Sequence, residues 1–344
     1  MNERILVVRL DSDGDVLVCG PAIRAAAAGR DGSSTEVTVL CGPSGRQAAG
    51  LLPGVRRVIE WPCPWIMSEP PEVSSADIGT LVEELAAARF DAALVLTSFH
   101  QSSLPTALVL RLAGVREIAA ISSDYPGSLL DHRIRPDVDM DDDQPEPMRA
   151  LQVASKAGFV LPSGDGGGLQ VLPPPDVRSL TGESPYVVVH PGASVPARAW
   201  SPSRWAHVVT ALRQDGQRVV VTGNANEREL TAYVAGTDGI DLGGRTSYPE
   251  LAGVLTHAET VVVGNTGPAH LAASVGTPVV SLFAPVVPAR RWAPFGVPVR
   301  LLGNQDAACA GSRATRCRIH GHPCLNSITA RDVIAAVKSL VREL

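Results

Sequence analysis

Three aspartates at alternate positions follow the first apolar run of the chain. The segment Asp11–Asp15 reads DSDGD and comes directly after Arg4–Leu10 (RILVVRL). A carboxylate at the end of a buried strand can serve as a general base that accepts a proton. Three carboxylates would repel a diphosphate, which nucleotide-binding turns meet with glycines and backbone N–H groups. We therefore predict that nucleotide phosphates bind elsewhere in the chain.

The acidic segment also fits simpler structural roles. Its Asp-x-Asp-x-Asp spacing matches the start of a calcium-binding loop, but Val16 stands where that loop needs glycine and Ala22 where it needs glutamate, so calcium binding is not predicted. The aspartates would also suit the positive N-terminal end of the helix that follows, as helix caps. Spacing alone leaves the base and capping roles open.

The second half of the chain carries two segments of the opposite character. His190–Ser194 (HPGAS) follows a buried apolar run, and Asn265–His270 (NTGPAH) follows another and opens a helical pattern. Small uncharged residues with glycine at a helix N-terminus form an anion site from backbone N–H groups. Arg198, just beyond the first segment, would add charged donors to a phosphate. Together the segments predict that a nucleoside diphosphate binds in this half.

Glu227 ends the segment GNANE and has two interpretations. With Asn226 as the cap, Glu227 falls in the first turn of a helix, where the helix dipole favours a carboxylate. Alternatively, Glu227 accepts the hydroxyls of a ribose, as acidic residues do in other nucleotide-binding folds. An isolated histidine such as His270 is more often structural than functional.

Three of the six cysteines lie near the C-terminus. Cys309, Cys317 and Cys324, with His320 and His322, supply enough ligands for zinc. Their spacing is not the Cys-x-x-Cys type of structural zinc sites, so we expect structural or free thiols and no metal. The N-terminus reads as a strand rather than a secretion signal, so the cysteines are expected to be reduced.

Short apolar runs alternate with helical patterns along both halves. Strands are predicted at 4–10, 35–41, 91–96, 117–121, 186–190, 218–222, 260–264 and 278–283. Helices are predicted at 77–89, 104–112, 148–157, 203–214, 226–235, 247–256, 267–275 and 329–342, the last capped by Asn326 or Ser327. This alternation indicates parallel sheets covered by helices on both faces.

Acidic, proline-rich and glycine-rich segments separate the halves. Asp137–Pro147, Pro162–Gly168 and Leu172–Asp176 cannot continue regular structure, which places the boundary between about residues 160 and 184. We predict Rossmann-like domains at 1–165 and 185–328 and a C-terminal helix at 329–344. Ligands of such sheets bind beyond the carboxyl ends of the strands.

Charge and hydropathy exclude several classes of protein. The formal net charge of -5 lacks the basic footprint of a nucleic-acid binder. No stretch reaches the roughly 18 apolar residues of a membrane span. No G-x-G-x-x-G follows the first strand, which argues against a nicotinamide dehydrogenase. We expect a cytoplasmic protein.

Five segments, in this order, resemble the motifs of glycosyltransferase family 9, the ADP-heptose:lipopolysaccharide heptosyltransferases. They are Ile5–Arg24 with its Gly-Asp-Val turn, Val187–Trp205 with Pro-Gly-Ala-Ser and a basic residue before Trp-x-Pro, Val221–Leu230 with Gly-x-x-x-Glu, Asp241–Leu255 and Val262–Ser274. The resemblance covers nearly the whole chain except the acidic and linker region.

The resemblance implies a GT-B fold, in which two Rossmann-like domains face each other across a cleft. The first domain would bind the acceptor and the second the donor. Members of the family invert configuration, need no metal or cofactor, and in many cases transfer heptose from ADP-heptose. The resemblance therefore implies a nucleotide-sugar donor, a glycan or glycolipid acceptor of the cell envelope, and peripheral association with the inner membrane face.

The same resemblance assigns roles to single residues. Asp15 takes the position of the catalytic base, with Asp13 and Gly14 on the acceptor side, and Arg198 that of a basic residue at the donor phosphate. Glu227 takes the ribose-binding position and Thr246 the adenine site. The remaining donor-binding positions are Gly192, Ser194, Asn265, Thr266, Gly267 and His270.

The chain departs from the family at one position and leaves two alternatives open. The family usually has aspartate where this chain has Asn265, which keeps hydrogen bonding but loses charge and puts the heptose contact in question. Other interpretations are a GT-B enzyme such as a UDP-sugar epimerase, or a non-catalytic nucleotide-sugar-binding protein. Retention of Asp15, Arg198 and His270 together argues against the non-catalytic protein.

Overall fold

The computed structural model describes residues 2–30, 33–237 and 239–342. The chain divides into two compact units, Met1–Leu172 and Pro173–Leu344, and each is described by itself. Among the described helices, none combines the length and apolar character needed to cross a lipid bilayer.

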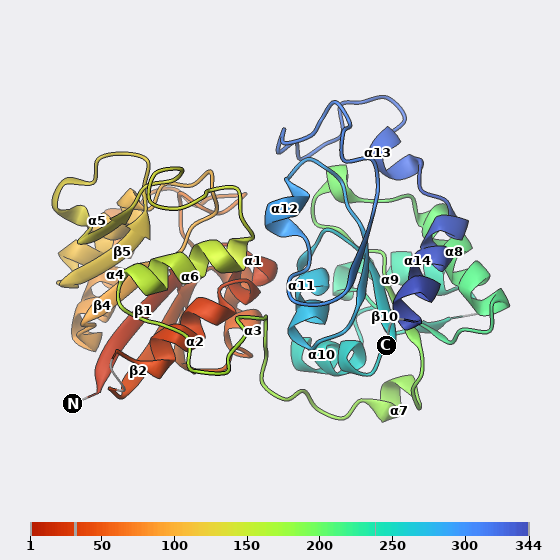
Figure 1. Cartoon of the computed structure of the whole chain (residues 1–344), viewed down its shortest axis with the longest axis horizontal. Helices are drawn as coiled ribbons and strands as arrows, with labels where there is room; N and C mark the ends of the chain where they lie inside the picture. Colours follow the sequence, from red (N-terminus) through yellow and green to blue (C-terminus); the bar gives the residue numbers. More distant parts are fainter. Residues whose placement is uncertain (1, 31–32, 238, 343–344) are drawn as a thin grey trace. The chain divides into compact units, whose positions relative to one another are not determined.

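The first unit is a six-stranded parallel sheet between two layers of helices (Figure 1). Its strands are β1 (Glu3–Arg9), β2 (Thr35–Cys41), β3 (Val55–Glu60), β4 (Ala92–Val95), β5 (Glu117–Ile121) and β6 (His132–Ile134). Its main helices are α1 (Asp13–Leu17), α2 (Gly20–Ala28), α3 (Arg46–Ala49), α4 (Ser75–Ala88), α5 (Leu104–Leu112) and α6 (Glu146–Lys156).

The strand order of this sheet is β3-β2-β1-β4-β5-β6. Helices α4 and α5 bury their apolar sides with one face of the sheet, while α2 and α6 pack on each other. The order reverses direction between β1 and β4, and ligands of doubly wound sheets bind at that switch point, beyond the carboxyl ends of the strands. The acidic segment follows β1 and therefore lies at this point.

The second unit repeats the plan with the order β12-β11-β10-β7-β8-β9, all parallel. Its strands are β7 (Val187–His190), β8 (Val219–Val221), β9 (Ile240–Asp241), β10 (Thr260–Gly264), β11 (Val279–Leu282) and β12 (Val299–Leu302). Its helices are α7 (Arg178–Thr181), α8 (Pro202–Gln214), α9 (Arg228–Ala235), α10 (Tyr248–Thr256), α11 (Gly267–Ser274), α12 (Ala289–Trp292), α13 (Pro323–Asn326) and α14 (Ala330–Val341).

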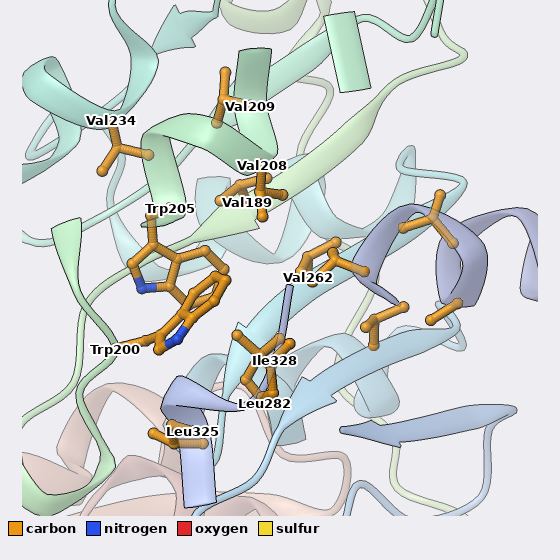
Figure 2. Packing of buried hydrophobic residues seen from close by; sticks show 14 of the residues in the cluster. Val189, Trp200, Trp205, Val208, Val209, Val234, Val262, Leu282, Leu325 and Ile328 are labelled. Carbon is orange, nitrogen blue, oxygen red and sulfur yellow. The ribbon is translucent and has the colours of Figure 1, made fainter. Parts of the chain in front are cut away.

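The core of the second unit joins its sheet to α8, α9 and α14. Trp200 and Trp205 meet edge to face with ring centroids 5.1 Å apart. They belong to one cluster with valines of α8 and the strands and with Leu282, Leu325 and Ile328 (Figure 2). The chain has few aromatic side chains, so valine, leucine and alanine fill most of this core. The packed core fixes the carboxyl ends of β7 and β10, and the switch point lies between these two strands.

Asp13 and Asp15 lie in the first turn of a short helix, α1, near its positive end. One local prediction is wrong. The last helix is not capped by Asn326 or Ser327, because Asn326 ends α13 and Ser327 follows it. Thr329 caps α14 instead, with its hydroxyl accepting a hydrogen bond from the Asp332 N–H at 3.2 Å.

Candidate active site

The acidic segment of the first unit is held by its own helix and by a buried arginine. One carboxylate oxygen of Asp15 accepts hydrogen bonds from the Ser12 hydroxyl at 2.6 Å and the Ser12 N–H at 3.3 Å. The other accepts a charged hydrogen bond from Arg9 Nη2 at 2.9 Å. Asp15 therefore does cap its helix, as one of the two interpretations predicts, while its side chain keeps 19% exposure. The cap does not exclude a role as base.

Arg9 is the centre of this arrangement and is only 2% exposed. Its Nε lies 2.8 Å from Asp11, and its Nη2 donates to Asp15 and, at 2.7 Å, to the Ser98 hydroxyl. Glu146 of α6 adds a carboxylate 3.9 Å from Nη1. Despite burial, the nearby carboxylates raise the pKa of Arg9, so the guanidinium stays charged. Breaking such a buried pair from one side typically costs about 3–5 kcal/mol.

Arg9, Ser98 and Glu146 were not among the residues predicted for the site. Arginine is rarely buried unless it is paired, and Arg9 is a charged residue directly after the apolar residues 5–8 of a central strand. That contrast was a readable signal for a buried ion pair. Ser98 and Glu146 carried no such signal, because they reach Arg9 only through the fold.

Burial shifts the ionisation of the other two aspartates. Burial raises the pKa of Asp13 to about 6, against a hydrogen bond from the Ala48 N–H that lowers it. Burial also raises the pKa of Asp11, while Arg9 and a hydrogen bond from the Gln101 amide at 2.5 Å oppose the shift. The three carboxylates of this segment are therefore not equivalent. Asp11 and Asp15 both contact Arg9, and Asp15 is the more exposed of these two.

In the second unit, adjacent strands bring the two glycine-containing segments together. The loop after β7 carries Arg198, whose Nη1 donates to the Asn265 carbonyl after β10 at 3.5 Å. Both loops leave the carboxyl edge of the sheet at its switch point, where β7 pairs with β10. The predicted grouping of Arg198 with Asn265 and its neighbours therefore exists in the structure.

Gly192 lets a carboxylate approach the backbone after β7. A Cβ atom at this position would lie 2.1 Å from Oε1 of Glu227, so any other residue would displace that side chain. Glu227 also accepts a hydrogen bond from the Asn224 N–H at 2.8 Å. Asn224, and not Asn226 as predicted, caps this turn, since its side chain accepts from the Asn226 N–H. Gly192 and Glu227 thus lie together.

Asn265 uses its side chain to join two strand ends. Its Nδ2 donates to the Ala284 carbonyl at 3.3 Å, and its Oδ1 accepts from the Ala284 N–H at 3.4 Å. The residue is 6% exposed. An aspartate could accept one of these hydrogen bonds but would set a carboxylate oxygen against the carbonyl. Asparagine therefore suits this position for a structural reason that the sequence did not reveal.

The α11 helix begins directly after this pair. Thr266 is its extended N-cap residue, and Gly267 opens the helix. The N–H groups of such a first turn favour an anion. His270 is 7% exposed, and its ring lies 6.5 Å from that of Trp292. These residues follow β10, as predicted.

Two predicted donor positions lie further out. Ser194 is exposed in the loop after β7. Thr246 is partly exposed between β9 and α10, and β9 is two strands from β7 in the sheet. Their roles rest on the resemblance alone.

All six cysteines are free thiols. Cys309 and Cys324 are buried, and burial raises the pKa of Cys324 to about 11. Within residues 2–30, 33–237 and 239–342, no group of three histidine, cysteine or acidic side chains is arranged to hold a metal ion.

Comparisons with known proteins agree with this architecture. The chain is 30% identical to lipopolysaccharide heptosyltransferase 3 of Escherichia coli over 162 residues, which are 45% of this chain and 47% of that relative. It thus spans about half the length of the curated relatives it matches.

Two solved structures share the whole fold. A family 9 glycosyl transferase from Veillonella parvula has a TM-score of 0.76 at 17% identity and covers 99% of this chain and 98% of its own. The E. coli ADP-heptose lps heptosyltransferase II has a TM-score of 0.74 at 20% identity and covers 99% of both chains. The model of glycosyltransferase family 9 (heptosyltransferase) matches residues 78–322. The chain belongs to glycosyltransferase family 9 and has the GT-B fold of two doubly wound parallel sheets.

Proposed function

We propose that this protein is an inverting, metal-independent glycosyltransferase that moves a sugar, heptose from ADP-heptose, to a hydroxyl of a cell-envelope glycan or glycolipid. The observation that carries the proposal is the grouping of Arg198, Gly192, Glu227 and the α11 N-terminus at one sheet edge. This edge offers a guanidinium, backbone N–H groups and a carboxylate, which suit a diphosphate and a ribose. E. coli heptosyltransferase WaaC, a neighbour of similar fold, is described with ADP and with ADP-2-deoxy-2-fluoro heptose.

The reaction would be a single displacement. The acceptor oxygen forms a bond to the anomeric carbon as the bond from that carbon to the β-phosphate oxygen breaks. Asp15 takes the proton of the acceptor hydroxyl, and its partial exposure supports this role. Arg198 and the first turn of α11 stabilise the charge that develops on the leaving nucleoside diphosphate.

Metal independence is part of the proposal, because Arg198 and backbone donors would do the work that a divalent ion does elsewhere. One neighbour of similar fold at 15% identity, TibC of enterotoxigenic E. coli, is described as an iron-containing glycosyltransferase. The cytoplasmic face of the inner membrane is the proposed place of action, since the acceptor would be a membrane glycan.

The test is transfer measured by mass spectrometry with ADP-heptose and a mixture of envelope glycan acceptors. We expect a product only when donor and acceptor are both present, with activity unchanged by excess EDTA. Conversion of UDP-N-acetylglucosamine without any acceptor would instead support an epimerase. Tight ADP binding in calorimetry without turnover of any donor would support a non-catalytic binding protein. Reversible loss of transfer activity in EDTA would refute metal independence.

A further inference from the structure

A polar pocket opens at the carboxyl edge of the first unit's sheet, beside the acidic segment. Segments Thr97–Ser102 and Ile121–Asp124 line it with Pro136 and Arg149, and its volume is about 230 Å³. These segments follow β4 and β5, on the far side of the switch point from β1. The volume is below the roughly 300–1,000 Å³ of pockets for drug-sized ligands, which suits a single sugar ring.

The wall of this pocket offers hydroxyl and amide groups. Ser98, Ser102, Ser122 and Ser123 supply hydroxyls, Gln101 an amide, His100 an imidazole and Asp124 a carboxylate. Hydroxyl and amide groups both donate and accept hydrogen bonds, and a carboxylate accepts them, which matches a ring that carries several hydroxyls.

Arg149 supplies the one guanidinium group among the described residues of the wall, and this group is already hydrogen-bonded to carboxylates. Its Nε and Nη2 donate to Asp142 Oδ1 at 3.0 and 2.7 Å. Its Nη1 donates to both oxygens of Glu146 at 3.2 and 3.3 Å and lies 3.4 Å from the Thr97 carbonyl. An arginine has five N–H groups, so little of this fork remains for a ligand anion.

The second arginine near the pocket is engaged in the same way. Arg9 contacts Asp11, Asp15 and the Ser98 hydroxyl. A phosphate or carboxylate in the pocket would lie near the Asp124 carboxylate of the wall and near Asp11, which is hydrogen-bonded to Gln101. The guanidinium groups of Arg9 and Arg149 are already bonded to carboxylates of the protein. Like charges repel, so these carboxylates disfavour an anion in the pocket.

The pocket is connected to the proposed base by two hydrogen bonds. Ser98 lines the pocket, and its hydroxyl accepts from Arg9 Nη2, which also donates to Asp15. A ring held in the pocket is therefore adjacent to the network that holds Asp15.

We propose that this pocket binds an uncharged, hydroxyl-rich sugar ring of the acceptor and discriminates against phosphorylated or carboxylated sugars. That the bound sugar belongs to the acceptor rests on the proposed function, but sugar binding itself can be measured without any donor. It specifies an acceptor sugar without charge, in contrast to an anionic sugar.

The experiment is saturation-transfer NMR on the full chain without nucleotide. The probes are neutral methyl glycosides of glucose, galactose and mannose, each at millimolar concentration, and the matched 6-phosphates. We expect signals from at least one neutral glycoside and a signal at least fivefold weaker from its phosphate. Ser123→Trp, at an exposed wall position, should abolish the signal, while Ser155→Trp on the exposed side of α6 should not.

A charge exchange tests the discrimination directly. Asp124 is exposed, so Asp124→Arg should fold and should raise the phosphate signal to that of the neutral glycoside or above. The proposal is overturned if no neutral glycoside gives a signal sensitive to Ser123→Trp, or if the wild-type protein binds the phosphates equally well. If these binding results are obtained but no heptose is transferred from ADP-heptose, the proposed function is refuted and the proposed sugar binding in the pocket still stands.

Discussion

Asp13 is a carboxylate whose ionisation the fold opposes. Its pKa of about 6 lies above the ordinary 3.8, so between these values the native state binds more protons than the unfolded chain. The free energy of unfolding therefore falls as pH rises through this window. Asp13→Asn removes the effect and can still accept from the Ala48 N–H. We expect it to stabilise the protein at pH 7.5 by on the order of 1–3 kcal/mol, and clearly less at pH 4.5.

Urea unfolding at the two pH values measures this difference. Asp165 is a control of opposite sign, because its hydrogen bonds from Arg24 lower its pKa. Its contribution is present above pH 3.8 and lost as pH falls further, so Asp165→Asn should destabilise the protein at both pH 7.5 and pH 4.5. Equal effects of Asp13→Asn at the two pH values would show that Asp13 is not the titrating group.

Asn265 gives a second prediction at the scale of one side chain. Asn265→Asp should place a buried carboxylate oxygen against the Ala284 carbonyl and lower the free energy of unfolding by about 1–3 kcal/mol at pH 8. The exposed Asn304 only accepts, from the Asp306 N–H, so Asn304→Asp should change stability by less than about 0.5 kcal/mol. Denaturation with urea measures both. A fully stable Asn265→Asp protein with faster heptose transfer would mean that residue 265 contacts the donor sugar.

The sequence allows a site residue to be predicted where its role depends on neighbouring residues in the chain. It does not reveal the hydrogen-bond partners that the fold brings from distant positions. The repulsion between Asp11–Asp15 and a diphosphate follows from composition alone. The pairing of Arg9 with Ser98 joins positions 89 residues apart, and Asn265 meets Ala284 across 19 residues. Such contacts depend on strand order, which no local pattern encodes. Asp15 as base and the donor roles in the second unit stay predictions.

At the scale of elements, the N-cap of the last helix, α14, should contribute measurably to the stability of the protein. The Thr329 hydroxyl accepts from Asp332 N–H, and the Asp332 carboxylate accepts from the Thr329 N–H at 2.8 Å. Thr329→Ala should therefore destabilise the protein by about 1 kcal/mol. Ser327→Ala, at one of the positions favoured by the sequence analysis, should cost less than about 0.5 kcal/mol. The two midpoints of thermal unfolding decide the question, and a larger loss at Ser327 would restore the original assignment.

Central strands were predictable and edge strands were not. β7 and β10 are apolar runs because both of their faces are buried, and the sequence analysis found them. β3 (Val55–Glu60) carries two arginines and a glutamate, and β6 (His132–Ile134) has three residues, so neither shows a buried run. Both lie at the edges of the first sheet, where one side of the strand is unpaired. The switch-point loops were found because they follow central strands.

At the scale of the whole molecule, each unit was predicted as a Rossmann-like half, and the two sheets have the same strand order. The proposal assigns the base to the first unit and the donor to the second. Variants in the two units should then differ in which kinetic constant they change. Asp15 and Arg198 are the residues for this comparison.

Asp15→Asn keeps one side-chain oxygen, which can still accept from Ser12, and loses the second acceptor that Arg9 uses. Arg9 retains Asp11, so the fold should survive. If Asp15 is the base, turnover falls by about two to four orders of magnitude while ADP affinity is unchanged. Arg198→Ala should weaken ADP binding and turnover together, because it removes a phosphate partner. Ser12→Ala is the control: it removes the capping hydroxyl at Asp15 and leaves the carboxylate. Calorimetry with ADP and the rate of transfer distinguish a general base from a helix cap at Asp15. Equal rates for Asp15→Asn and Ser12→Ala would mean that Asp15 only caps the helix.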